Sequence, residues 1–301
     1  MCGIVGLHLT DRSLEPELGR LFVPLLTAMT RRGPDSAGVA VYAAPLSEGI
    51  ERYSLRSTRA TTDWDAVATA LESSTPGGIE VLDVVDKGPA GVITVSGPPQ
   101  VVLAGLAETA TEVAVVGHGR SMEIYKDVGA PADICRRFGI DEASGYQAVG
   151  HTRMATESAV TMAHSHPFAP SSDLCLVHNG SFSNHATLRR RLEDKGIRCD
   201  TDNDSEVAAR YVADRLQRGD DLKEALRWVL KEFNGFFTLV VTTRDEFAVV
   251  RDPFACKPLV VAESEGYVAV ASEYHALATL PGIESARVFE PMPEEIHAWS
   301  R

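Results

Sequence analysis

Hydrophobic residues along the chain follow two periods, and each period predicts a different kind of element. Apolar residues alternate with other residues over 4–9 and 236–242, which is typical of strands. Over 16–30 and 207–216 they recur every three or four positions, which predicts helices with one buried face. Pro24 lies inside the first of these helices, and we expect it to kink the helix or to begin its second half.

Residues 49–118 have their own order of predicted strands and helices. Asp63 is the expected N-cap of the first helix in this segment. Strands are predicted over 50–57, 79–85, 91–95 and 112–116, and helices over 63–73 and 98–109. The order β-α-β-β-α-β is the pattern of a ferredoxin-like fold. We therefore expect 49–118 to form an inserted subdomain, and it contains no cluster of titratable residues that resembles a site.

The rest of the chain mixes short helices and strands with polar motifs. A helix capped by Asn184 is expected to stop at Gly196. Further helices are predicted over 131–138 and 222–233, and strands over 39–43, 174–177, 247–251, 268–271 and 295–299.

Composition and charge exclude several classes of protein. The chain has 301 residues, 44% hydrophobic and 24% charged, which indicates a globular protein with a sizeable core. A net charge of −13 argues against a nucleic-acid partner. No apolar run approaches a membrane span, so no membrane association is expected, and the N-terminus lacks the layout of a signal peptide. Five scattered cysteines indicate reduced thiols, so we expect a cytoplasmic protein.

Cys2 is the first residue with candidate chemistry. Because its side chain is small, we expect Met1 to be removed, which leaves Cys2 with a thiol and a free α-amine. An α-amine titrates near pH ~7.7–8.0, so at neutral pH it can accept the thiol proton and later protonate a leaving amine. The alternative is an ordinary buried cysteine at the start of a strand, and Cys2 alone does not decide between the two.

Further positions supply the other groups that amide hydrolysis needs. Asn179 and Gly180, expected in a tight turn after a strand, offer a side-chain amide and a backbone N–H for an oxyanion. Arg153 is suited to clamp a carboxylate and Asp204 to receive an ammonium group. The structural alternatives are a hairpin turn, a surface ion pair and a helix N-cap. With Cys2, the set describes a pocket for an amino acid that carries a side-chain amide, of which glutamine is the simplest.

Three histidines raise the alternative of a metal site: His164, His166 and His178. A His-x-His pair beside proline has no matching set of carboxylates or cysteines, so we predict no metal. His166 is instead expected to brace the loop around the substrate.

Six motifs occur in the order in which they stand in class II glutamine amidotransferases, and the chain resembles that family. They are Met-Cys-Gly-Ile-Val-Gly at the N-terminus, Arg-Gly-Pro-Asp-Ser-Ala-Gly at 32–38, Gly-His-Thr-Arg-Met-Ala-Thr at 150–156, His-Asn-Gly at 178–180, Asn-Asp-Ser-Glu-Val at 203–207 and Arg-Asp-Pro-Phe-Ala-Cys-Lys-Pro-Leu at 251–259. The resemblance covers about 1–48 and 119–301, which would form the amidotransferase domain, and leaves 49–118 outside it.

The resemblance implies an α+β fold, a four-layer αββα sandwich of antiparallel sheets, as in N-terminal-nucleophile (Ntn) hydrolases. By motif position, it implies that Cys2 is the nucleophile, with its own α-amine as the base. Asn179 and the N–H of Gly180 are implied to form the oxyanion hole. Arg153 is implied to bind the glutamine carboxylate, and Asp204 its α-amine.

The same resemblance adds three supporting positions and two departures. Thr156 and His166 are implied to lie in the loop around the substrate, and Arg32 to support the nucleophile. Met154 stands where many members have tryptophan, so the lid over the site is expected to close differently. Ala-Cys at 255–256 replaces the more usual Gly-Ile, with an expected effect on packing only.

Within the family, the sequence of residues 150–158 and the long insertion resemble stand-alone subunits related to glutamate synthase. These are the GlxB type, including the first subunit of N-methylglutamate synthase. The resemblance implies a glutaminase that supplies nitrogen to separate synthase subunits, with FMN and iron–sulfur centres on the partner and no cofactor in this chain. Because the chain is expected to end where the glutaminase domain ends, acceptor chemistry is expected on other polypeptides. Two alternatives stay open: a free-standing hydrolase of γ-glutamyl amides, and a non-catalytic glutamine-sensing subunit.

Overall fold

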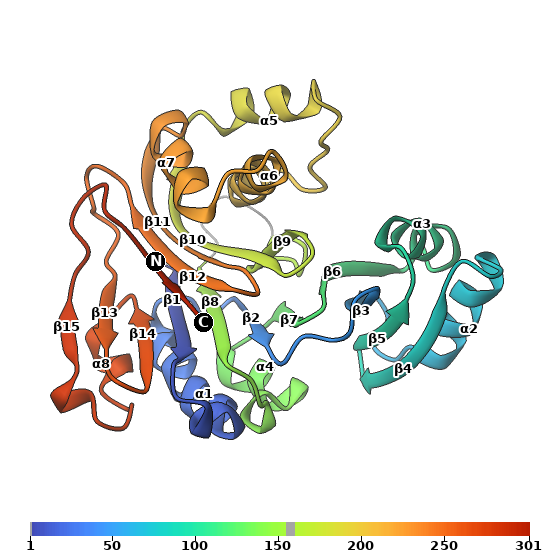
Figure 1. Cartoon of the computed structure of the whole chain (residues 1–301), viewed down its shortest axis with the longest axis horizontal. Helices are drawn as coiled ribbons and strands as arrows, with labels where there is room; N and C mark the ends of the chain where they lie inside the picture. The colour runs from blue at the N-terminus through green and yellow to red at the C-terminus, as the bar shows by residue number, and fades with distance from the viewer. Residues whose placement is uncertain (1, 155–159) are drawn as a thin grey trace.

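The computed structural model describes residues 2–154 and 160–301. Within these residues the strands form sheets of seven, five and four strands, and helices pack against them (Figure 1). No helix in this part of the chain is long and apolar enough to cross a bilayer.

The seven-stranded sheet has the N-terminal strand at its centre, and all its neighbouring strands are antiparallel. Every residue of that central strand is buried, which confirms the strand predicted over 4–9. Pairing on both sides holds it in place, and Cys2 directly precedes it. In sheet order the strands are β15 (Arg287–Phe289), β13 (Val260–Glu263), β14 (Tyr267–Ala271), β1 (Gly3–Leu9), β8 (Gln147–Arg153), β2 (Ser36–Tyr42) and β7 (Met122–Val128).

The five-stranded sheet carries Asn179 and Gly180 inside a strand. Its strands, in sheet order, are β16 (Ile296–Ser300), β12 (Glu246–Arg251), β11 (Gly235–Thr242), β10 (Leu174–Phe182) and β9 (Phe168–Ser171). Asn179 and Gly180 pair with Thr238 and Phe237, so the tight turn predicted for this dipeptide is wrong. Pairing with β11 continues through this dipeptide. Glycine is required at 180 because the residue adopts φ +151° and a Cβ there would lie 1.9 Å from the Phe236 carbonyl oxygen.

Helices cover the outer faces of these two sheets, which gives four layers (Figure 1). On the seven-stranded sheet lie α1 (Leu18–Ala28), α4 (Pro131–Phe138) and α8 (Tyr274–Leu277). On the five-stranded sheet lie α6 (Asp204–Gln217) and α7 (Leu222–Glu232), and α5 (His185–Glu193) packs against α6. α1 is continuous, with Pro24 inside it, so Pro24 does not begin a new helix. Between the sheets, apolar side chains such as Val149, Val177 and Val240 form a third core.

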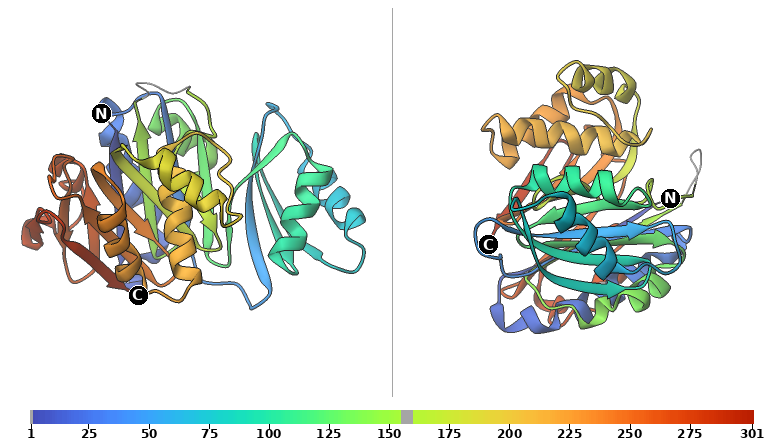
Figure 2. Two further views of the ribbon diagram at one scale, coloured as in Figure 1. Left: turned by 90° about the horizontal axis from the view of Figure 1, so that it is seen from above. Right: turned by 90° about the vertical axis from the view of Figure 1, so that its right-hand side faces the viewer.

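The third sheet belongs to one continuous segment and lies beside the two-sheet body (Figure 2). Its elements in chain order are β3 (Ile50–Ser57), α2 (Trp64–Ser74), β4 (Glu80–Lys87), β5 (Ala90–Ser96), α3 (Pro99–Thr109) and β6 (Val113–Gly119), and the sheet order is β4-β5-β3-β6. The carboxylate of Asp63 accepts a hydrogen bond from Ala66, which confirms the expected N-cap. We call this segment the 50–119 unit; its status as an insertion stays a prediction.

Buried polar contacts join the 50–119 unit to the rest of the chain. The carboxylate of Glu51 accepts a hydrogen bond from Ser172 (2.7 Å), and Arg56 pairs with Asp127 on β7 (2.9 Å). Asp173 accepts hydrogen bonds from three successive backbone N–H groups where β6 leads into β7. These contacts fix the unit beside β7 and the β9–β10 hairpin.

Candidate active site

The backbone carbonyl of Cys2 is held from two sides. Nε of Arg32 donates a hydrogen bond to it (2.9 Å), and so does Nδ2 of Asn179 (3.1 Å). The strand that follows is anchored by Ile4, whose N–H donates to Oγ of Ser272 (2.9 Å). The structure therefore brings three of the predicted site residues into direct contact.

Arg32 is fixed in turn by a carboxylate that the sequence analysis missed. Its guanidinium forms an ion pair with Glu273 at 2.7 Å, and its side chain is only 9% exposed. The hydrogen bond from Arg32 lowers the pKa of the Glu273 carboxyl. Glu273 follows β14 and stands in none of the six motifs, so only the pairing of β14 with β1 reveals it.

Arg153 is the last residue of β8, and it lies at the same end of the sheet as Cys2, which precedes β1. Gly3 pairs with Thr152, and the next residue along β8 is Arg153, which pairs with Ser36 of β2. The whole residue is 6% exposed, which rules out the alternative of a surface ion pair.

Asn179 retains hydrogen-bonding capacity beyond its contact with Cys2. A side-chain amide has two N–H donors, and the bond to the Cys2 carbonyl uses one of them. The residue is 3% exposed, so the second donor lies in a largely desolvated place, where a hydrogen bond to an oxyanion is strong.

Asp204 is the first residue of α6, and its carboxylate is tied to β10. One oxygen accepts a hydrogen bond from the N–H of Phe182 (2.8 Å), and the other accepts from the hydroxyl of Ser205 (3.1 Å). The N-cap of α6 is Asn203, whose side chain accepts from the Ser205 N–H, so the N-cap alternative for Asp204 is wrong. Nδ1 of His178 lies 3.8 Å from the Asp204 carboxylate.

His166 belongs to a buried cluster of histidine rings. Its ring centroid lies 4.0 Å from that of His151 and 6.5 Å from that of His178. Nε2 of His151 donates to the His178 carbonyl (3.0 Å), and Nδ1 of His178 bonds the Ser205 hydroxyl (2.8 Å). Neither ring nitrogen of His166 has a partner in the described part of the chain. The cluster links β8, β10 and the start of α6.

Burial controls the charge of these three rings. It lowers the pKa of His151 to about 3, that of His166 well below 6.5, and that of His178 also below 6.5. All three are therefore neutral at neutral pH. Across 2–154 and 160–301, no group of three or more His, Cys, Asp or Glu side chains is placed to hold a metal ion.

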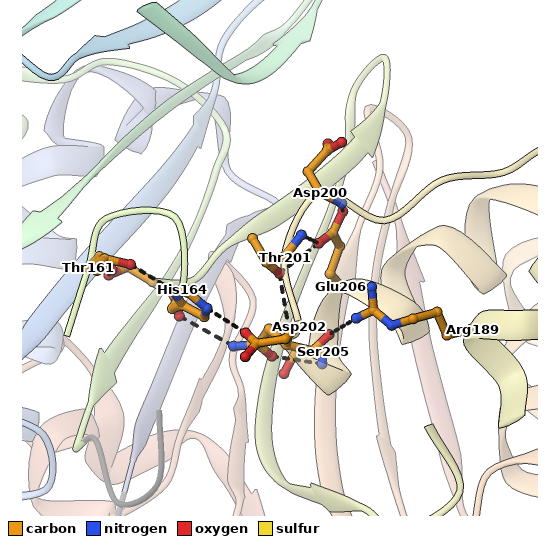
Figure 3. Close-up of polar contacts among 10 residues, drawn as sticks. Thr161, His164, Arg189, Asp200, Thr201, Asp202, Ser205 and Glu206 are labelled. Carbon is orange, nitrogen blue, oxygen red and sulfur yellow. Dashed lines mark hydrogen bonds and ion pairs between the residues drawn. The ribbon is translucent and has the colours of Figure 1, made fainter. Parts of the chain in front are cut away.

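The loop before α6 is organised by Glu206 (Figure 3). Its carboxylate accepts hydrogen bonds from the N–H groups of Asp200 (2.8 Å) and Thr201 (2.7 Å) and from the Thr201 hydroxyl (2.7 Å). Burial raises the pKa of Glu206, but these hydrogen bonds and the Arg210 charge together outweigh it and lower the pKa overall. His164 reaches the same loop through Asp202, at 2.6 Å. The segment around His166 and the loop before Asp204 are thus held together.

Comparison with known proteins identifies the family. A model described as "Glutamine amidotransferase domain" matches residues 151–279. The "Glutamine amidotransferase-like protein GlxB" of Rhizobium meliloti (strain 1021) is 47% identical over 301 residues, which are 99% of this chain and 98% of that protein. The chain belongs to the class II glutamine amidotransferases.

Two further comparisons cover only part of longer proteins. The amidophosphoribosyltransferase of Methanocaldococcus jannaschii is 32% identical over 176 residues, 58% of this chain and 37% of that one. The solved glutamine phosphoribosylpyrophosphate amidotransferase from B. subtilis matches with a TM-score of 0.62 at 18% identity, over 100% of this chain and 49% of that one. The chain thus spans about half of that solved protein, and the likeness confirms the Ntn-hydrolase-like α+β fold with antiparallel sheets.

Five of the predicted site residues fall into two groups. Cys2 accepts hydrogen bonds from Arg32 and Asn179. Asp204 accepts one from Phe182 of β10, and the His166 ring lies beside that of His178. Thr156 lies outside the described residues, so its role stays a prediction. His151, His178 and Glu206 were not predicted as site residues, although each stands inside one of the six motifs.

Proposed function

We propose that this amidotransferase is a glutaminase that hydrolyses glutamine to glutamate and ammonia, with Cys2 as the nucleophile. The observation that carries the proposal is the hydrogen bond from the Asn179 side chain to the Cys2 carbonyl, because it sets the proposed oxyanion donors beside the proposed nucleophile. The buried Arg153 at the same end of the sheet would bind the glutamine carboxylate, and Asp204 would bind its α-ammonium group.

The proposed reaction has two stages. The α-amine of Cys2 takes the thiol proton, and the thiolate attacks the side-chain amide carbon of glutamine. Asn179 and the Gly180 N–H stabilise the oxyanion that forms. The α-ammonium group then protonates the amide nitrogen, the C–N bond breaks to release ammonia, and a γ-glutamyl thioester remains. Water, deprotonated by the same amine, hydrolyses the thioester to glutamate and restores the thiol.

The fate of the ammonia follows from the resemblance to GlxB-type subunits and is part of the same proposal. Separate glutamate-synthase-like or N-methylglutamate-synthase-like subunits would accept the nitrogen, with FMN and iron–sulfur centres on those subunits. Co-purification of this chain with such a subunit, and glutamine-dependent product formation by the complex, would support this step. Formation of product from free ammonium alone, with no gain from glutamine and this chain, would contradict it.

The decisive test is glutamate release from glutamine by the purified chain, with intact mass confirming that Met1 has been removed. Cys2→Ala should keep its fold and reduce turnover by roughly 10⁴-fold or more, as expected for loss of a covalent nucleophile. Cys256→Ala is the matched control, because Cys256 is an exposed free cysteine. Turnover by Cys2→Ala at the wild-type rate would refute the mechanism. A strong preference for larger γ-glutamyl amides, or glutamine binding without turnover even with the synthase subunits present, would favour the two alternatives.

A further inference from the structure

A cavity of about 480 Å³ lies where the 50–119 unit meets the five-stranded sheet. Its walls come mainly from β6, β9 and the first half of α6, which Figure 1 shows on neighbouring parts of the molecule. Most lining side chains are small and apolar, among them Ala114, Val115, Ala169 and Ala209. The volume falls in the range of roughly 300–1,000 Å³ that is usual for small-molecule sites.

One polar wall of this cavity carries two carboxylates and one guanidinium. Arg210 forms ion pairs with Asp200 (2.6 Å) and Glu206 (3.1 Å). Glu206 also accepts the hydrogen bonds from Asp200 and Thr201 that hold the loop before α6. The Asp200 side chain is 79% exposed, so solvent screens its charge, and Arg210 balances the buried carboxylate of Glu206.

The remaining charged group of the lining is Lys126 of β7. Its Nζ donates to the carbonyls of Ser165 (2.9 Å) and Pro167 (3.2 Å) and lies 5.0 Å from the centre of the Phe168 ring. An ammonium group has three N–H donors, and these carbonyls use two of them. No carboxylate in the described part of the chain forms an ion pair with it. Burial lowers the pKa of Lys126 to about 8, against the opposing effect of the Glu206 charge.

We propose that this cavity binds a small aliphatic carboxylate, with the carboxylate on the Lys126 ammonium and the hydrocarbon chain between β6 and β9. The carboxylate supplies the counter-charge that a buried ammonium otherwise lacks. The apolar walls favour a hydrocarbon body over a polar one. A cationic ligand is disfavoured, because it would meet the buried ammonium with like charge.

The cavity is separate from the proposed glutaminase site. None of its lining residues is among Cys2, Arg32, Arg153, Asn179 and Asp204. Binding can therefore be measured without turnover, and its outcome does not depend on glutaminase activity.

The test is calorimetric titration of the full-length chain with hexanoate and, as a matched neutral probe, hexanamide. Wild type should bind one hexanoate saturably and hexanamide at least about tenfold more weakly, because only the acid carries the charge. Lys126→Met should weaken hexanoate binding by about tenfold or more. Ala114→Trp should do the same by filling the cavity from an exposed position on β6, with Lys126 intact. Lys223→Met, an exposed lysine on α7, is the control and should bind like wild type.

Three results would overturn the proposal. They are the absence of saturable hexanoate binding to wild type, equal binding of hexanamide, and hexanoate binding that neither Lys126→Met nor Ala114→Trp changes. If Lys126→Met does not fold, Ala114→Trp decides.

Discussion

The side chains of Arg32 and Asn179 meet at the carbonyl of Cys2, and this contact defines the proposed chemistry. Arg32 approaches from the segment between α1 and β2, and Asn179 from β10. Cys2 is thereby fixed between the two sheets, close to the donors that an oxyanion would need.

Asn179→Ala removes the proposed side-chain donor to the oxyanion. We expect kcat for glutamine hydrolysis to fall by roughly 10²–10³-fold with a smaller change in KM, since the donor acts mainly in the transition state. Steady-state kinetics measure this, and circular dichroism checks that β10 is intact. A kcat within about threefold of wild type would assign Asn179 a purely structural role.

His166 supports a prediction about pH at the same scale. Unfolded histidine binds a proton below its ordinary pKa of 6.5, whereas buried His166 binds one only at much lower pH. The unfolded state therefore binds more protons, and the free energy of unfolding falls as the pH decreases below 6.5, by up to about 1.4 kcal/mol per pH unit for each such proton.

His166→Phe should reduce the slope of the unfolding free energy against pH by about one proton between pH 6 and 5. The carboxylates contribute equally to the slopes of wild type and variant, so the difference reports His166. Urea unfolding at several pH values measures the two slopes. Identical slopes would show that His166 gains its proton in the folded chain as easily as in the unfolded one.

At the scale of elements, the start of α6 depends on the loop that precedes it. Glu206 lies in the first turn of α6, and its carboxylate accepts three hydrogen bonds from Asp200 and Thr201 of the preceding loop. Asn203 caps the helix, so Asp204 is left to face β10. The position of Asp204 is therefore set by its neighbours in the loop.

Glu206→Ala should loosen this loop and raise the KM for glutamine more than it lowers kcat, because Asp204 is proposed to hold the substrate ammonium group. Loss of the buried acceptor should also cost about 1–3 kcal/mol of stability. Glu108→Ala, on the exposed face of α3, is the control and should change neither quantity appreciably. An unchanged KM for Glu206→Ala would show that this loop does not contribute to glutamine binding.

At the scale of the whole molecule, Asp173 holds the junction between the 50–119 unit and the two-sheet body. It is 7% exposed, and its carboxylate accepts from the N–H groups of Arg120, Ser121 and Met122. Gly119 is packed against it, since a Cβ there would lie 2.1 Å from Oδ1 of Asp173.

Asp173→Ala should lower the free energy of unfolding by about 2–3 kcal/mol, because three backbone donors lose their acceptor in a buried place. Asp173→Asn should cost less, because it keeps one acceptor oxygen and tolerates the φ of +54° at this position. Urea unfolding measures both, with the exposed Asp133→Ala as control. Equal losses for Asp173→Ala and Asp133→Ala would remove Asp173 from this role.

The sequence by itself determined what depends on neighbours along the chain. The period of apolar residues predicts β1 and the amphipathic helices, and Asp63 as an N-cap follows from the residue type and the start of a helix. Motif order is also readable in one dimension, and it identified the family with Cys2 and Asn179 as candidate site residues.

Only the tertiary structure decided what depends on partners distant in the sequence. Asn-Gly favours a turn locally, but pairing with β11 keeps Asn179 and Gly180 in a strand. Glu273 supports Arg32 across 241 positions, and the charge of His166 depends on burial among rings from other strands. Long-range pairing and desolvation set these properties, and neither leaves a periodic trace in the local sequence.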